Sequence, residues 1–197
     1  MMAVSRETAD LLAEYARLVR KWTPRINLIA AGTVPDLEQR HIADSLQLFA
    51  LANPERQSWC DLGSGGGFPG LVVAIAAQGR NVPVTLIESD RRKSAFLATV
   101  IRELGLRDTR VLTQRIEAAP AQKAAIVSAR ALAPLPRLMS YVHQHLAPGG
   151  AAWLMKGARW QQEVTDARQS WRFEVEPQPS STDPEATILH VTQIAPL

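Results

Sequence analysis

The stretch Cys60-Asp61-Leu62-Gly63-Ser64-Gly65-Gly66-Gly67-Phe68-Pro69-Gly70 decides the fold of this chain. Ser58-Trp59-Cys60 is typical of the end of a buried strand, and five glycines follow within the eight residues 63–70. Glycine is used where the backbone needs a positive φ or where a ligand must approach closely. Pro69 stands where a helix would begin, and the apolar run 71–77 continues that helix. The order of strand, glycine loop and helix indicates an α/β domain that binds a nucleotide or nucleoside.

The glycine spacing fits two classes of ligand. Gly65-x-Gly67-x-x-Gly70 satisfies the dinucleotide pattern, which is weak evidence by itself, whereas Asp61-x-Gly63-x-Gly65-x-Gly67 is the pattern of S-adenosylmethionine-dependent methyltransferases. A dinucleotide lays an anionic pyrophosphate on such a loop, and the carboxylate of Asp61 would repel it. S-adenosylmethionine has no phosphate and carries an ammonium and a sulfonium, which suit Asp61. The alternative is a tight turn without a ligand, but a plain turn does not need so many glycines.

The composition is that of a soluble globular protein with one α/β domain. Its 197 residues suffice for a real core, and 46% apolar with 21% charged residues is ordinary. The single cysteine, Cys60, excludes an internal disulfide framework and favours the cytoplasm. We expect neither a signal peptide, because acidic residues interrupt the N-terminus, nor a membrane span. The formal charge of +3 and the pI near 9.4 permit an anionic partner.

Two helices are expected before the glycine loop. Apolar residues recur at helical spacing from Leu11 to Trp22, and we expect this helix to end at Thr23 because Pro24 disfavours helical backbone in the preceding residue. A second helix is expected from near Pro35 to Ala52, before Asn53-Pro54. We expect residues 1–56 to form a helical extension packed on a methyltransferase domain of residues 57–197.

Strand and helix patterns alternate after the loop. Strands are expected at 84–88, 111–112, 124–128, 151–155, 173–175 and 187–191, and helices at 91–104, 135–146 and 160–170. This alternation predicts an α/β, Rossmann-like fold with a mostly parallel sheet and helices on both faces. The last two strands form a hairpin-like pair, which predicts one antiparallel edge strand.

Four residues at strand ends are candidate ligand contacts. Glu88 ends a strand about 20 residues after the loop, where an acidic residue accepts hydrogen bonds from ribose hydroxyls. Ile116 and Glu117 follow the next strand, where Ile116 could pack on the face of an adenine. The alternative is that the two residues belong to an ordinary loop with Glu117 in water. Arg130 follows the fourth strand at the ligand edge, where it could meet an anionic group or pair with Asp61 or Glu88.

The histidines give no sign of a metal site. His41 precedes Asp44 by three residues, so Asp44 could orient it along a helix, although a surface hydrogen bond is the simpler interpretation. His143 and His145 lie near a helix end, where the dipole favours a cation. Zinc spacing is absent from the sequence, and so is a serine or paired-cysteine nucleophile, and we expect no metal.

Basic residues form three groups near the expected ligand edge. A charge group is often only a solvated surface, but the shared edge favours a nucleic-acid footprint. We expect these residues to hold an RNA backbone. They are Lys21, Arg25, Arg91, Arg92, Lys93, Lys156 and Arg159.

Taken together, these motifs resemble the glucose-inhibited division protein B family. The resemblance rests on Arg40-His41-Ile42-x-Asp44-Ser45 and on the loop ending in Gly67-Phe68-Pro69-Gly70, and it covers the chain from about Trp22 to Val191. Shorter matches are Lys21-Trp22, Asn27-Leu28, Glu88-Ser89, Arg130-Ala131 and Lys156-Gly157. Members are bacterial methyltransferases that make 7-methylguanosine in small-subunit ribosomal RNA.

The resemblance implies methyl transfer from S-adenosylmethionine to nitrogen 7 of a guanine, with S-adenosylhomocysteine as the product. It implies that Gly63, Phe68, Ile116, Glu117 and Arg130 contact the cofactor. Nitrogen 7 has a lone pair and no proton, so we expect no general base, and catalysis can rest on positioning and electrostatics, with Arg130 near the reacting centre.

One motif departs from the family pattern, and the substrate has alternatives. Ser128-Ala129-Arg130 departs from the Ser-Arg-Ala that is common in the family, which leaves the role of Ser128 undecided. We expect a monomer that acts on small-subunit ribosomal RNA or on the small subunit itself. The alternatives are a ribosome-assembly factor without catalysis and a methyltransferase acting on a small molecule.

Overall fold

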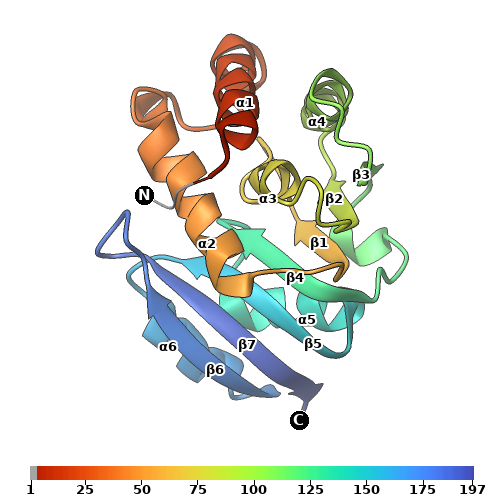
Figure 1. Ribbon diagram of the computed structural model, residues 1–197. Coiled ribbons are helices and arrows are strands. Elements are labelled where there is room, and N and C mark those ends of the chain that lie inside the picture. Colours follow the sequence, from red (N-terminus) through yellow and green to blue (C-terminus); the bar gives the residue numbers. More distant parts are fainter. Residues whose placement is uncertain (1–3) are drawn as a thin grey trace.

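A computed structural model describes residues 4–197 of the chain, and within them seven strands form one sheet. The strand order is β3-β2-β1-β4-β5-β7-β6, as Figure 1 shows. The strands are β1 (Trp59–Leu62), β2 (Val84–Glu88), β3 (Thr109–Thr113), β4 (Ala124–Arg130), β5 (Leu146–Lys156), β6 (Trp171–Pro179) and β7 (Thr187–Pro196).

Strands β1 to β5 run parallel, which confirms the mostly parallel sheet. Every residue of β1 and β2 is buried, as expected for parallel strands that are covered on both faces. The antiparallel pair is also confirmed: β7 runs opposite to both β5 and β6, and β6 is the outermost strand. The strand order reverses between β1 and β4, so a ligand crevice is expected at their carboxyl ends.

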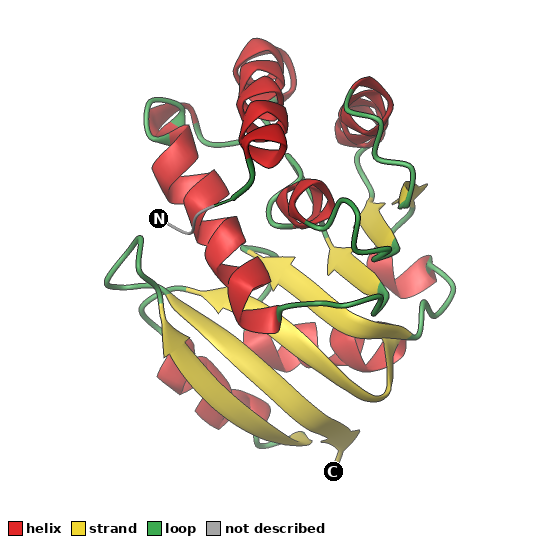
Figure 2. Cartoon of the chain, viewed as in Figure 1, coloured by secondary structure: helices red, strands yellow, loops and turns green. Residues whose placement is uncertain are grey.

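Helices cover both faces of the sheet (Figures 1 and 2). The helices α1 (Arg6–Ile26), α2 (Asp44–Ala52), α3 (Gly70–Ala76) and α4 (Arg91–Glu103) lie on one face, and α5 (Leu135–His145) and α6 (Trp160–Ala167) on the other. Short helical segments lie at Ala31–Thr33, Glu38–Ala43 and Ile116–Ala118, of which Glu38–Ala43 is a π-helix that continues into α2. Each face has its own apolar core. In the described part of the chain, every helix is too short or too polar to cross a bilayer.

The expected end of the first helix was wrong, because α1 continues through Pro24 to Ile26. A proline removes the hydrogen bond to the carbonyl four residues earlier. Here that residue is Arg20, which lies on the exposed side of the helix. The chain leaves the helix at Asn27, whose φ of 50° is the left-handed cap conformation.

The N-terminal helices pack directly on the glycine loop. Tyr15 of α1 is fully buried, and its hydroxyl donates to the carbonyl oxygen of Gly66 at 2.6 Å. Its ring lies 5.3 Å from that of Phe68, measured between centroids. The first 56 residues therefore help to shape the ligand edge, while their separation as a unit from residues 57–197 stays a prediction.

Candidate active site

A cavity of about 550 Å³ opens at the carboxyl ends of β1, β2 and β4. This volume is within the range of sites that hold a small molecule or cofactor. Seven of the nine expected cofactor contacts line it: Gly63, Gly65, Phe68, Glu88, Ile116, Glu117 and Arg130. Asp61 and Gly67 are not part of the lining. The convergence follows from the parallel sheet, which brings successive strand ends to one edge.

The glycines of the loop divide between ligand access and packing. Gly65 lines the cavity with φ +54°, a backbone conformation that side chains rarely adopt. Gly70 serves packing instead, because a Cβ atom there would lie 2.4 Å from Cδ2 of Leu86 and 2.6 Å from Oδ2 of Asp61. The loop can thus approach a ligand from one side and the sheet from the other.

Asp61 lies beneath the loop and not at the cavity surface. Its carboxylate is fully buried, and Oδ1 accepts a 2.6 Å hydrogen bond from the hydroxyl of Ser128, which in turn accepts from Nε1 of Trp59 at 2.8 Å. These contacts join β1 to β4 and give Ser128 a structural role. Burial raises the pKa of Asp61 to about 6, although the hydrogen bond from Ser128 opposes this rise. The expected contact between Asp61 and the cofactor finds no support in this position.

The variant Asp61→Asn is expected to change how stability depends on pH. In the folded protein the pKa of about 6 lies above the ordinary 3.8, so between these values the folded state binds more protons than the unfolded chain. As the pH rises from about 4 to above 6, the ionisation of Asp61 therefore lowers the free energy of unfolding by about 3 kcal/mol in total. In urea denaturation, the variant should gain stability relative to wild type between pH 4 and pH 7. The exposed Asp10→Asn controls for the lost charge, and a difference for Asp61→Asn that stays constant with pH would contradict the raised pKa.

Glu88 fastens the glycine loop to β2. It is 8% exposed, its Oε2 accepts from the backbone N–H of Gly65 at 2.8 Å, and its Oε1 accepts from that of Asp90 at 2.8 Å. Each carboxylate oxygen has further lone pairs. Glu88 can thus hold the loop and still accept hydrogen bonds from ribose hydroxyls.

Ile116 and Glu117 lie side by side in the turn Ile116–Ala118 but differ in exposure. Ile116 is buried, and its carbonyl oxygen lies 3.0 Å from Nε2 of His145. Glu117 is exposed and pairs with Arg115 at 2.9 Å. Burial lowers the pKa of His145, which favours the neutral ring as a donor to the carbonyl oxygen of Ile116.

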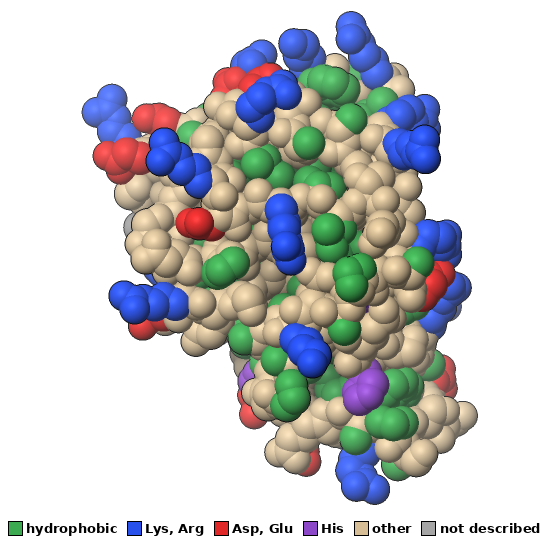
Figure 3. Space-filling view, turned by 90° about the vertical axis from the view of Figure 1, so that its right-hand side faces the viewer, with side chains coloured by type: hydrophobic (Ala, Val, Ile, Leu, Met, Phe, Trp, Pro, Cys, Tyr) green, Lys and Arg blue, Asp and Glu red, His purple; other side chains and the backbone are tan. Residues whose placement is uncertain are grey.

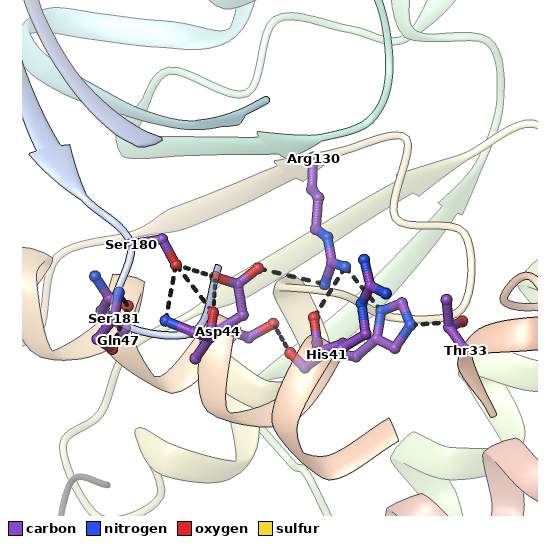
Figure 4. Close-up of polar contacts among 10 residues, drawn as sticks. Thr33, His41, Asp44, Gln47, Arg130, Ser180 and Ser181 are labelled. Carbon is purple, nitrogen blue, oxygen red and sulfur yellow. Dashed lines mark hydrogen bonds and ion pairs between the residues drawn. The ribbon is translucent and has the colours of Figure 1, made fainter. Parts of the chain in front are cut away.

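Arg130 is held by the N-terminal segment (Figure 4). Its NH2 group donates to Nδ1 of His41 at 2.8 Å and to the carbonyl oxygen of Arg40 at 3.1 Å, while NH1 lies 3.9 Å from Oδ2 of Asp44. Neither Asp61 nor Glu88, the acidic partners considered from the sequence, pairs with it. The guanidinium is therefore oriented by residues that come 86 to 90 positions before it in the sequence.

His41 and Asp44 act on Arg130 separately and do not pair with each other. Burial first, and then the charge of Arg130, lower the pKa of His41 to about 4, so its ring is neutral at pH 7. Since Nδ1 accepts from Arg130, the Nε2–H donates to Oγ1 of Thr33 at 3.0 Å. Asp44 accepts from the hydroxyls of Ser180 at 3.2 Å and Thr182 at 3.0 Å. His41 lies in the π-helical segment, a distortion frequent at functional sites.

The basic residues expected to hold RNA differ in accessibility. Lys156 is not a free surface cation, because its side chain is only 10% exposed and its Nζ lies 2.5 Å from Oε2 of Glu163. Lys93 lines the main cavity. The remaining five are exposed, and basic side chains are scattered over the face in Figure 3 and not gathered in one cluster. These five are Lys21, Arg25, Arg91, Arg92 and Arg159.

Some lining residues were not found from the sequence. Arg137 and Tyr141 of α5 line the cavity and are joined by a 2.7 Å hydrogen bond from Nε of Arg137 to the hydroxyl. Their spacing of four residues was a helical signal, but without the fold nothing indicated which face of α5 meets the cavity. Among the described residues, no group of three or more His, Cys, Asp and Glu side chains could hold a metal ion.

The fold is the one shared by a class of proteins, the S-adenosylmethionine-dependent methyltransferases. A predicted O-methyltransferase from Agrobacterium tumefaciens has a TM-score of 0.61 and 18% identity, with 75% of this chain and 79% of that chain covered. An RNA methyltransferase from Salinibacter ruber, solved with S-adenosyl-L-homocysteine, has a TM-score of 0.55 and 20% identity, covering 74% and 87%. At these levels of sequence identity, the similarity establishes the fold alone.

Closer relatives define the family. The family described as GidB, rRNA small subunit methyltransferase G, matches residues 8–187. A ribosomal RNA small subunit methyltransferase G from Paracoccus denitrificans is 56% identical over 191 residues, 97% of each chain, and one from Rhodospirillum centenum is 51% identical over 98% of this chain and 88% of the relative. This chain belongs to the GidB family, which confirms the resemblance found in its motifs.

Proposed function

We propose that the protein transfers the methyl group of S-adenosylmethionine to nitrogen 7 of a guanine in small-subunit ribosomal RNA. One observation carries this proposal: the glycine loop, Glu88 and Arg130 meet at a single cavity in a chain of the GidB family. The names of the relatives support ribosomal RNA as the substrate. The guanine and its nitrogen 7 rest on the motif resemblance.

The residues of the cavity fit S-adenosylmethionine chemically. Glu88 offers acceptors for the ribose hydroxyls, and the buried Ile116 offers an apolar contact for the adenine. The backbone of Gly63 and Gly65 lets the ligand approach the loop. Arg130 can donate to an anionic group such as the amino-acid carboxylate. When bound, S-adenosylmethionine supplies a methyl group activated by the sulfonium.

The acid–base state of the site suits an acceptor without a proton. His41 is the histidine in the cavity lining, and its Nδ1 already accepts from Arg130. An imidazole with this partner is a poor general base, as its pKa of about 4 reflects. Guanine nitrogen 7 attacks with its own lone pair, so positioning and electrostatics are sufficient for catalysis.

The surface of the protein carries exposed cations that can contact RNA phosphates. We infer that the five exposed basic residues named above hold the RNA backbone, because phosphate contacts dominate such binding. The substrate segment is single-stranded or splayed, since a base must leave its stack to reach a buried reacting centre. We further infer that the protein acts as a monomer in the cytoplasm.

Incubation with methyl-radiolabelled S-adenosylmethionine tests this proposal. Small subunits, deproteinised small-subunit RNA and a cell extract freed of RNA serve as acceptors. We expect label in the RNA of at least one of the first two. RNA binding without label in either would favour the assembly-factor alternative, and label only in the RNA-free extract would favour a small-molecule substrate.

A further inference from the structure

A second cavity, of about 480 Å³, adjoins the first. The two share Ala131, Leu132 and Ala133, which follow β4. The far wall of the second cavity comes from the segment after β5 and from the first turn of α6. A molecule in the second cavity would therefore lie next to a molecule in the first, beside this short segment.

The second cavity contains a fixed ion pair. Nζ of Lys156 lies 2.5 Å from Oε2 of Glu163 and donates to the carbonyl oxygen of Ala133 at 3.0 Å. The same Oε2 accepts from the backbone N–H of Leu135 at 2.8 Å. These contacts leave a third N–H of Lys156 and the oxygen Oε1 of Glu163 for a ligand. The pair is partly exposed to the cavity, with side chains 10% and 22% exposed, and such an ion pair adds little net stability compared with apolar packing, so its position in the cavity wall points to recognition.

The remaining walls suit the face of a flat ring. Leu132, Pro134 and Met155 contribute apolar surface, and the exposed Arg159 lies at the rim. An aromatic base can pack between such walls while its edge meets the ion pair. A cation at the rim suits the phosphate of a nucleotide that has left its stack.

The ion pair matches the edge of guanine. Guanine presents an acceptor, O6, beside two donors, N1–H and the N2 amino group, and O6 is adjacent to nitrogen 7. A lysine donates to O6, and a carboxylate accepts from the two donors. Adenine presents a donor, N6, beside an acceptor, N1, so the same pair would face two mismatched contacts.

We propose that the second cavity receives the acceptor guanine, with Lys156 donating to O6 and Glu163 accepting from N1–H and N2–H. This inference rests on the proposed function and adds a specificity site to it. Nitrogen 7 then faces the first cavity, past the shared lining residues. Its lone pair forms the bond to the methyl carbon while the carbon–sulfur bond breaks and its electrons go to sulfur, so no proton moves. Lys156 thereby acquires a role different from the phosphate contact expected from the sequence.

A cycle with a base analogue tests this assignment. The target guanine is mapped first, and small subunits are reconstituted with RNA carrying guanine or inosine at that position. Inosine lacks the N2 amino group and keeps O6 and nitrogen 7. We compare wild type, Glu163→Gln and the control Glu174→Gln, an exposed residue of β6. S-adenosylhomocysteine affinity and thermal denaturation are measured for each protein.

We expect inosine to lower kcat/KM of wild type and of Glu174→Gln by about tenfold, because a hydrogen bond to a carboxylate is lost. Glu163→Gln should lower kcat/KM for guanine by about 10- to 100-fold, with a much smaller further loss on inosine and unchanged S-adenosylhomocysteine affinity. The guanine site would be overturned if inosine lowered kcat/KM of Glu163→Gln by the full tenfold, or if it did not lower kcat/KM of wild type. Either result would leave the proposed function standing. Absence of transfer by wild type to guanine subunits would overturn the proposed function itself.

Discussion

Replacing Arg130 with alanine is expected to lower kcat/KM for small-subunit RNA by about 100-fold or more, the loss typical of removing a fixed donor beside a reacting centre. The guanidinium is oriented by the carbonyl oxygen of Arg40, by Nδ1 of His41 and by Asp44, so it meets the cavity in one geometry. Such orientation avoids reorganisation during the reaction. Arg130→Lys should recover little of the activity, because an ammonium cannot make these divergent contacts together.

The measurement is steady-state methyl transfer, together with calorimetry of S-adenosylhomocysteine binding and thermal denaturation. Arg172→Ala is the matched control, because Arg172 is exposed on β6. Loss of transfer by Arg130→Ala with a folded protein is the expected outcome. Wild-type kcat/KM in this variant would show that Arg130 has no part in the reaction.

Gly70→Ala is expected to lower the free energy of unfolding by about 3 kcal/mol and to weaken S-adenosylhomocysteine binding strongly. The new Cβ atom would lie 2.4 Å from Leu86 and 2.6 Å from the carboxylate of Asp61, and both of these side chains are fully buried. Asp61 is also tied to Ser128, so it has little freedom to move away. The start of α3 must shift instead, and the glycine loop shifts with it.

Urea denaturation and calorimetry measure these two effects. Gly32→Ala is the control, because nothing lies within 4 Å of a Cβ atom built there and its φ is not in the left-handed region. We expect the control to keep both stability and affinity. A Gly70→Ala protein with wild-type stability would contradict the close packing of α3 on β1 and β2.

Much of the candidate site was predictable from the sequence because it depends on strand ends. Parallel strands bring their carboxyl ends to one edge, so the positions of Glu88, Ile116 and Arg130 along the chain were sufficient to place them together. The glycine loop was recognisable for a similar reason, since its spacing reflects local backbone requirements. These features need no knowledge of distant contacts.

The features that could not be predicted concern residues whose partners lie far away in the chain or on another element. Asp61 is buried by its pairing with Ser128 on the neighbouring strand, so its distance from the cavity could not be deduced from the loop alone. Lys156 resembled a surface cation until α6 brought Glu163 against it. The contacts of Arg130 with the segment containing His41 and Asp44 likewise depend on how the N-terminal helices pack on the sheet.

In the function proposed above, this cavity brings an activated methyl group to nitrogen 7 of a guanine in small-subunit ribosomal RNA. Nucleoside analysis tests it most directly: small subunits are labelled by the protein, their RNA is digested to nucleosides, and the labelled product is identified by mass spectrometry. We predict 7-methylguanosine as the labelled nucleoside. Label in any other nucleoside, or unlabelled RNA from a protein that binds S-adenosylhomocysteine, would contradict the account.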